Sequence, residues 1–353
     1  MRKIPLRKRI QGFSNIGRKL FGHSIPLFSV LKSPAAPIGS RSGPVQHFPV
    51  PTPRYVDSST LVCERSHILS IGKIRMIKIA AMGDNVVDCY ISRREMFPGG
   101  NCVNVAIHMS RFGAEAAYIG VVAADAAGRV IQAALRDEGV DTSHLRMEAT
   151  GKTAYCIIGH RGNNDRYFIR FDLGVSMFEP STADIQFARR FDAVHIGQSS
   201  GLDGWLDAIA PQRLSYDFST RRDVEHYRRI GPRCFLASVS GGELSSDQVT
   251  ATISCLRESG ADWVLVTRGT EGAVLAGSQG VFHAEATPIV AVDTLGAGDS
   301  FIARTLYGLL NGEAPATLLQ AASCVAAATC GQYGGTGHAA PIDLGEAIAE
   351  LQD

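Results

Sequence analysis

The chain reads Asp293-Thr294-Leu295-Gly296-Ala297-Gly298-Asp299-Ser300-Phe301 near the C-terminal end of a long alternation of strand and helix patterns. An apolar run at residues 288–292 predicts a strand before this stretch, and a helical periodicity over residues 300–310 follows it. The two glycines between them allow a tight turn. Such a turn presents free backbone N–H groups and the positive end of a helix dipole. The stretch therefore predicts an anion site suited to phosphate.

Asp299 lies at the mouth of this expected anion site. A carboxylate in that position can accept the proton of an attacking hydroxyl while the N–H groups of the turn hold the phosphate being transferred. Asp is also a common N-cap residue of helices. Taken alone, the stretch fits a catalytic base and a helix cap equally well, because short glycine motifs recur by chance.

The nine residues resemble the C-terminal signature of the ribokinase-like (PfkB) carbohydrate kinases, Asp-Thr-x-Gly-Ala-Gly-Asp. The resemblance implies an α/β fold of three layers, α/β/α, with a mainly parallel central sheet and a small lid of β-strands. It also implies ATP as the phosphoryl donor and Mg²⁺ bound to its phosphates. In this interpretation Asp299 is the general base, and the backbone of Gly296, Ala297 and Gly298 stabilises the phosphoryl group in transfer.

A second motif follows the first clean strand pattern, at residues 76–82, and reads Gly83-Asp84-Asn85-Val86-Val87-Asp88. Ligands of parallel sheets bind beyond the carboxyl ends of the strands, so Asn85 and Asp88 are expected to meet a sugar there. The carboxylate of Asp88 accepts two hydroxyl hydrogen bonds, which suits vicinal OH groups. A turn built from Asp and Asn explains Asp84 and Asn85 about as well.

The third motif is Pro98-Gly99-Gly100-Asn101-Cys102-Val103-Asn104-Val105-Ala106, which opens a helical pattern. Gly99 and Gly100 allow the backbone to approach a ligand closely. Asn101 and Asn104 are three residues apart and share one face of the first helical turns. Asn101 has an alternative role as a helix cap, whereas Asn104 lies past the cap position.

These two N-terminal motifs resemble the same kinase family, and their pairing resembles its fructoselysine 6-kinase branch. Many family members have Lys or another residue where this chain has Asn101. The resemblance implies phosphorylation of a sugar or fructosamine at its 6-hydroxyl, with substrate contacts from Asp88, Asn85, Gly99, Gly100, Asn101 and Asn104. Ribose, fructose and 2-keto-3-deoxygluconate are the rival acceptors. A non-catalytic sugar-binding sensor with the same fold is the rival from another functional class.

Two later strands end in segments that resemble nucleotide contacts of the family. Residues 217–221, Asp-Phe-Ser-Thr-Arg, are similar to the family's Asp-x-Asn-x-Arg, with Ser219 in place of Asn. Arg221 is then either a phosphate ligand or a solvated charge. Residues 263–272 are similar to the family's Val-Thr-x-Gly-x-x-Gly. The implied cofactor-binding residues are Thr267, Gly269, Gly272, Asp217 and Arg221, and a hairpin turn is the alternative role of Gly272.

The metal motif of the family is only partly present. The family has Asn-x-x-Glu after the next strand, whereas this chain has Ser240 at the Asn position and Glu243 at the Glu position. The resemblance implies that Glu243 places Mg²⁺ through water. The glycine-rich loop at residues 331–337 is expected to border adenine or a monovalent cation.

Strand patterns at residues 153–159 and 166–171 flank a Gly-Asn-Asn-Asp turn and predict a hairpin. In the resembled family such strands, together with strands near residues 87–98, form a lid over the sugar, and a closed lid excludes water. Three arginines near the lid are either partners for the carboxylate of a glycated amino acid or solvated charges: Arg93, Arg94 and Arg170. A homodimer that pairs through the lid is the expected assembly.

Charge is unevenly distributed along the 353 residues. Of the 35 Lys+Arg and 34 Asp+Glu, residues 1–75 hold 13 and 2. We predict that residues 1–75 are disordered and are translated upstream sequence. An organelle transit peptide, or a basic tail that touches nucleic acid or anionic lipid, is the alternative. Residues 76–353 are expected to form the kinase domain, with a small-molecule substrate and neither a nucleic-acid nor a membrane partner.

Eight cysteines are scattered along the chain without a Cys-x-x-Cys pair or a His partner at metal spacing. They predict reduced, mostly buried thiols in a cytoplasmic protein. A lone histidine such as His195 is expected to be a strand-end residue with satisfied hydrogen bonds rather than a catalyst.

Overall fold

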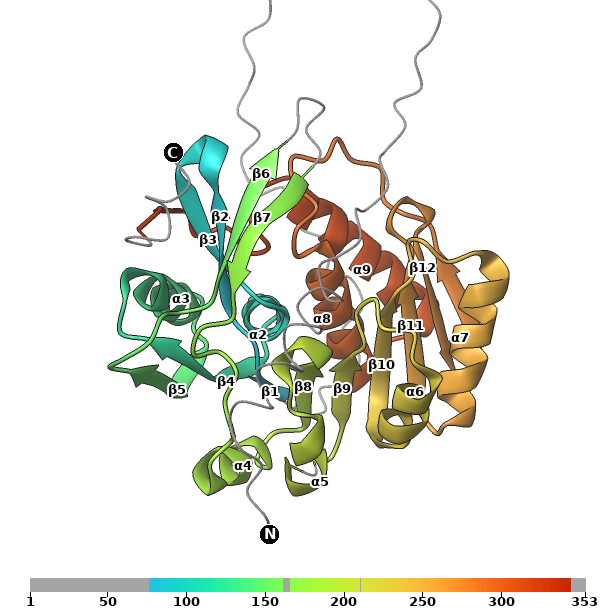
Figure 1. The fold of residues 1–353 in the computed structure, drawn as a ribbon. Helices are drawn as coiled ribbons and strands as arrows, with labels where there is room; N and C mark the ends of the chain where they lie inside the picture. Colours follow the sequence, from blue (N-terminus) through green and yellow to red (C-terminus); the bar gives the residue numbers. More distant parts are fainter. Residues whose placement is uncertain (1–75, 161–165, 210, 344–353) are drawn as a thin grey trace, which may run out of the picture. The chain divides into compact units, whose positions relative to one another are not determined.

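The structure is a computed structural model that describes residues 76–160, 166–209 and 211–343. Its strands form two sheets (Figure 1). The larger sheet contains, in spatial order, β13 (Gly280–Ala284), β12 (Ala273–Gly277), β11 (Trp263–Thr267), β10 (Cys234–Ser240), β9 (Leu214–Asp217), β8 (Ala193–Gly197), β1 (Lys78–Met82), β4 (Glu115–Ala123) and β5 (Asp141–Glu148). The smaller contains β14 (Ala340–Pro341), β3 (Glu95–Gly99), β2 (Val86–Tyr90), β6 (Tyr155–His160) and β7 (Arg166–Asp172).

The larger sheet is mainly parallel, as predicted. Every neighbouring pair from β11 across to β5 is parallel, and only β12 and β13 run antiparallel at one edge. Strands of this kind are apolar on both faces because helices cover both sides. In β1, Ile79 and Ala81 pack into one core, and Ala80 and Met82 pack into the other.

Helices cover the two faces of the larger sheet as separate layers. The first core is shared by α2 (Asn101–Arg111), α3 (Ala126–Asp137), α8 (Ala297–Leu310) and α9 (Pro315–Cys330). The second is shared by α4 (Thr182–Ala188), α5 (Leu206–Ile209), α6 (Val224–Ile230) and α7 (Ser246–Glu258). The predicted three-layer α/β/α architecture is therefore confirmed. No helix in the described ranges is both long and apolar enough to cross a membrane.

The smaller sheet projects beyond the end of the larger one at which β1 finishes (Figure 1). Strands β6 and β7 are antiparallel, which confirms the predicted hairpin, although its turn at residues 162–165 lies outside the described residues. Asp88 pairs with Phe97 on one side and Cys156 on the other, so these three residues share one face. That face packs toward Leu295 and Tyr333, beside the glycine turn.

The strand predicted at residues 288–292 is wrong. These residues form no regular structure, and Ile289, Val290 and Val292 are 48%, 93% and 48% exposed. Their β-branched composition favours a strand, but propensity supplies no pairing partner. The segment instead contacts the C-terminal end of α9, where the N–H of Val292 donates to the carbonyl of Cys330 at 2.8 Å.

A 3₁₀ turn at Asp203–Trp205 precedes the short helix α5. The disordered segment expected at residues 1–75 lies outside the described residues.

Candidate active site

The glycine turn ends at the N-terminus of α8. Gly296 is the N-cap residue, with φ at +75°, and a Cβ there would lie 2.3 Å from the Cα of Gly335. At Gly298, by contrast, a Cβ would meet nothing within 4 Å. No side chain caps this helix in the described part of the chain. The N–H of Ala297 donates to the carbonyl of Thr294 at 3.4 Å, and the N-terminus of α8, which has no side-chain cap, is a candidate anion site at the positive end of the helix dipole.

Asp299 is the third residue of α8 and not its cap, so the helix-cap alternative does not hold. Its Oδ1 accepts a hydrogen bond from Nδ2 of Asn101 at 2.8 Å, and its Oδ2 accepts one from Nδ2 of Asn104 at 2.7 Å. Burial raises the pKa of Asp299 to about 6. The hydrogen bonds from the two Asn amides lower this pKa, and the negative charge of Asp84 raises it. The carboxylate is thus mostly ionised at neutral pH yet more basic than a surface Asp.

Asn101 and Asn104 lie in the first turns of α2, whose N-cap is Gly100 with φ at +98°. Asn101 therefore does not cap the helix by its side chain. Its Nδ2 also donates to Oδ2 of Asp217 at 3.1 Å, and its backbone N–H donates to Oδ2 of Asp84 at 2.9 Å. The sequence expectation that both Asn side chains share one face is confirmed, and the group they meet is Asp299.

Asp217 is drawn into the same network. Its Oδ1 accepts from the backbone N–H of Ser219 at 2.9 Å and from the hydroxyl of Ser238 at 3.3 Å. Burial raises the pKa of Asp217 to about 7. The hydrogen bond from the N–H of Ser219 lowers this pKa, and the negative charge of Asp299 raises it. Asn101 therefore joins two carboxylates whose pKa values both lie above the usual range for Asp.

The remaining predicted sugar contacts lie at the start of the smaller sheet. Asp88 is buried against Gly99, where a Cβ would lie 2.1 Å from its Oδ2. At Gly100 a Cβ would lie 2.7 Å from the Cα of Asn85. The Nδ2 of Asn85 donates to the hydroxyl of Tyr118 at 3.0 Å and to the carbonyl of Val121 at 2.9 Å. Both glycines are thus needed for close packing, and the amide nitrogen of Asn85 is engaged inside the protein.

The predicted nucleotide residues lie on two segments, residues 217–221 at the end of β9 and residues 267–272 at the end of β11. Thr267 ends β11, and Gly269 follows in an exposed turn with φ at +57°. Gly272 has φ at +82°, and a Cβ there would lie 1.9 Å from the carbonyl oxygen of Ala284, which explains this glycine by packing of the hairpin. The side chain of Arg221 pairs with Asp223 at 3.0 Å, and the structure does not bring it into the Asp299 network.

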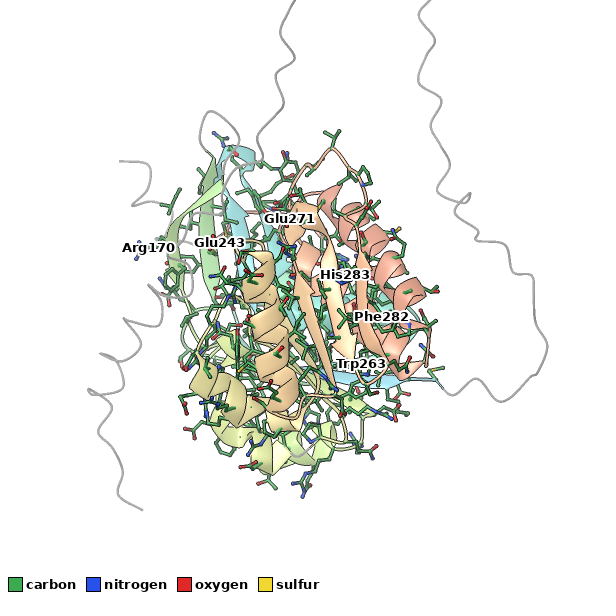
Figure 2. The ribbon with its side chains drawn as sticks, turned by 90° about the vertical axis from the view of Figure 1, so that its right-hand side faces the viewer. Arg170, Glu243, Trp263, Glu271, Phe282 and His283 are labelled. Carbon is green, nitrogen blue, oxygen red and sulfur yellow. The ribbon has the colours of Figure 1, made fainter. Side chains whose placement is uncertain are left out.

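Glu243 follows β10 with an exposed side chain. Figure 2 shows it near the same end of the larger sheet as Glu271, opposite the end that carries Trp263. The described residues contain no group of three or more His, Cys, Asp or Glu that could hold a metal ion. A single exposed carboxylate nevertheless fits Mg²⁺, which is commonly held by one or two carboxylates, several waters and substrate phosphates.

Arg93 and Arg170 lie in different parts of the lid region. The guanidinium of Arg93 lies 3.9 Å from the ring centroid of Tyr333, and its Nε pairs with Glu95 at 2.7 Å. Arg170 is opposite Ile157 in the register, on the face of the smaller sheet that does not carry Asp88. Figure 2 shows Arg170 at the outer edge of that sheet. Of these two, Arg93 is the one beside the Tyr333 loop.

Asp293 connects the glycine turn to the smaller sheet, a role that was not predicted. Its Oδ2 accepts from the hydroxyl of Tyr90 at 2.5 Å and from the N–H of Gly334 at 3.1 Å, and its Oδ1 accepts from the N–H of Leu295 at 3.1 Å. Tyr90 lies 203 positions away in the sequence, so no local pattern could have revealed the contact. The loop at residues 331–337 is thereby fastened beside the turn.

The family model for pfkB family carbohydrate kinase matches residues 65–210 and 236–342. The chain belongs to the PfkB family of carbohydrate kinases. It is accordingly an ATP-dependent sugar phosphotransferase, and the network around Asp299 is its candidate active site.

Curated kinases and solved structures agree with this assignment. The kinase is 34% identical to fructosamine kinase FrlD of Bacillus subtilis, over 76% of this chain and 96% of that protein. It is 31% identical to fructoselysine 6-kinase of Escherichia coli, over 71% of this chain and 97% of that protein. A ribokinase II from E. coli, solved with ATP and Mg²⁺, superposes with a TM-score of 0.64 at 20% identity, over 78% and 99% of the two chains. The ribokinase-like fold is therefore confirmed.

Proposed function

We propose that this kinase transfers the γ-phosphoryl group of ATP to the 6-hydroxyl of a fructosamine such as fructoselysine, with Asp299 as the general base. The observation that carries the proposal is the carboxylate of Asp299, held by two amide donors at the open N-terminus of α8. The names of the two similar curated kinases support the substrate class.

In the proposed mechanism the sugar lies under the smaller sheet, with Asp88 accepting hydrogen bonds from its hydroxyl groups. Asn101 and Asn104 hold Asp299 by both oxygens, so that the carboxylate is oriented toward the acceptor hydroxyl. Asp299 takes the proton of that hydroxyl while the hydroxyl oxygen attacks the γ-phosphorus atom. The bond between the γ-phosphorus and the β–γ bridging oxygen breaks, and ADP leaves. The backbone N–H groups of Gly296, Ala297 and Gly298 stabilise the charge on the transferred oxygens.

The nucleotide and the metal belong to the same proposal. We place ATP beside Thr267 and Gly269, with its phosphates toward Gly298. Mg²⁺ when bound neutralises charge on the phosphates, and Glu243 is the residue that would hold it through water. Roles for Gly272, Arg221 and a monovalent cation stay predictions.

A substrate panel tests the acceptor. Purified protein is assayed with ATP and fructoselysine, ribose, fructose or 2-keto-3-deoxygluconate, and the kcat/KM values are compared. We expect fructoselysine to have the highest value. A higher value for one of the other sugars would contradict the substrate class but not the kinase assignment.

The variant Asp299→Asn tests the base. Asn has the shape of Asp but cannot accept the proton, and its NH₂ group would face one of the two amide donors, so we expect kcat to fall by about 10²–10⁴-fold. Sugar binding, measured by calorimetry, should be retained. Unchanged turnover would exclude Asp299 as the base, whereas a wild-type protein that binds sugar without turning over ATP would support the sensor alternative that Ser240 favours. A homodimer through the lid stays a prediction that light scattering can test.

A further inference from the structure

His195 is a buried histidine at the middle of β8, and both of its ring nitrogens have partners. His195 is 0% exposed. Nδ1 lies 2.9 Å from the hydroxyl oxygen of Ser215 on the neighbouring strand, and Nε2 lies 2.8 Å from Oδ1 of Asn101. The expectation of satisfied hydrogen bonds is confirmed, whereas the expected position at a strand end is wrong. One of the two partners, Asn101, also contacts Asp299.

The network assigns the tautomer of His195. Nδ2 of Asn101 is a donor to both Asp217 and Asp299, so Oδ1 of Asn101 must be an acceptor. Nε2 of His195 therefore carries the hydrogen, and Nδ1 accepts the hydroxyl hydrogen of Ser215. Burial lowers the pKa of His195 to about 3, so the ring is neutral throughout the working pH range.

We infer that His195 is a positioning residue for phosphoryl transfer, which fixes the amide of Asn101 so that Nδ2 points at Asp299 and Asp217. This inference rests on the proposed role of Asp299 as the base. A flipped amide would turn Oδ1 toward two carboxylates and lose both hydrogen bonds. His195 opposes the flip because its Nε2–H donates only to an oxygen.

The backbone of β8 supports the same orientation. A Cβ at Gly197 would lie 2.5 Å from Oδ1 of Asn101, so the absence of a side chain there leaves the space that this oxygen occupies. The bonds then run from Ser215 through His195 and Asn101 to Asp299. Asn104 bonds only the second oxygen of Asp299, and it cannot replace the contact that His195 orients.

Two substitutions at one position separate orientation from simple packing. The amide nitrogen of Gln can occupy the place of Nε2, whereas the shorter Asn reaches only toward the place of Nδ1. We expect H195N to lower kcat by about 10- to 100-fold, as for a misplaced reacting group, with little change in the KM for ATP. We expect H195Q to recover most of that loss. Equal kcat values for H195N and the wild type would overturn the inference.

The pH profile is a second measurement, because a purely structural histidine would not move it. The hydrogen bond from Asn101 lowers the pKa of Asp299, so loss of that bond should move the acid limb of kcat/KM to higher pH in H195N. The charged groups that act on Asp299 from the neighbouring elements are Asp84 and Asp217, and both remain in this variant. An acid limb that stays in place in H195N would contradict the inference.

A double-mutant cycle with Asn101→Ala shows whether His195 acts through Asn101. If it does, H195N has no further effect on kcat in the N101A background, whereas multiplying effects would show an independent role. His226→Asn is the matched control, because His226 is equally buried and bonds Asp203 at 2.8 Å, outside this network. It should lower thermal stability without moving the acid limb. Activity loss in H195N that is matched by H226N would also overturn the inference, while full turnover in D299N would refute the proposed base separately.

Discussion

Asp299 shows how one residue can be tuned by opposing contacts. Burial disfavours its charge, and two amide donors favour it, so its pKa is raised to about 6 and not further. Because the proposed base must be ionised, kcat/KM should fall about tenfold per pH unit below pH 6 and level off above it. The measurement is kcat/KM from pH 5 to 8.5 with saturating Mg²⁺.

A profile that stays flat down to pH 5 would contradict this expectation. The Asp217 carboxyl, with its pKa raised to about 7, is joined to Asp299 by one Asn101 amide. The observed midpoint therefore belongs to the connected pair and not to Asp299 alone. Replacement of Asp217 by Asn removes one of the two titrating groups. If the midpoint belongs to the pair, kcat/KM should change over a narrower pH range in this variant.

At the scale of the helix, Gly296 and Gly298 serve different purposes although they are two residues apart. Gly296→Ala puts a non-glycine residue at a left-handed backbone position, and its Cβ would lie against the backbone of Gly335. We expect at least about 1–2 kcal/mol of destabilisation from the backbone alone. Urea denaturation measures it.

Gly298→Ala is the matched control for that change. A Cβ at Gly298 meets no atom within 4 Å, and Ala is the better helix former by about 1 kcal/mol, so stability should be unchanged or higher. The added methyl group occupies the open space proposed for phosphate, so the Kd for ATP should rise. A large loss of stability in G298A, or unchanged ATP affinity, would contradict the expected separation of roles.

The strand β2 is fastened to the glycine turn by the bond between Tyr90 and Asp293. Tyr90→Phe removes a hydrogen bond to a buried carboxylate, which contributes about 1.5–3 kcal/mol in typical cases. We expect the free energy of unfolding to fall by that amount, and the KM for the sugar to rise more than the KM for ATP. Cys156→Ser, on the same face of the smaller sheet, is a control that leaves this bond intact.

Much of the element order could be predicted because buried parallel strands and helices leave strong periodic patterns. The hairpin of β6 and β7, the helix α2 and the helix α8 follow from local residues alone. The strand predicted at residues 288–292 is wrong because a strand needs a neighbouring strand to pair with as well as β-branched residues. The fold could therefore be derived where local pattern and pairing agree.

The active site could be predicted only in part, for a related reason. Asp299, Asn101 and Asn104 each stand in a recognisable glycine motif, so the sequence indicated them separately. The contacts of Asn101 with His195 and Asp217 join residues 94 and 116 positions apart. Neither partner stands in a motif that marks this contact, and only the folded sheet brings the strand residues to one place.

At the scale of the whole molecule, the strands and helices that the structure describes lie between Lys78 and Pro341, and the family match begins at residue 65. We expect deletion of residues 1–75 to leave kcat/KM unchanged, because every proposed site residue lies after Met76. Activity of the shortened protein is compared with that of the full chain under one set of conditions. Loss of activity with retained thermal stability would show that the basic segment takes part in function.

The bond between Tyr90 and Asp293 has a consequence for how the two substrates bind. The carboxylate of Asp293 contacts a strand of the sheet that is proposed to cover the sugar and the turn that is proposed to hold the phosphates of ATP. Occupancy of either side should therefore change affinity on the other, and thermodynamic linkage requires the two factors to be equal. Calorimetric titration of ATP with and without sugar, and of sugar with and without a non-hydrolysable ATP analogue, would give the same coupling factor in both directions. In Tyr90→Phe that cooperativity should shrink toward one.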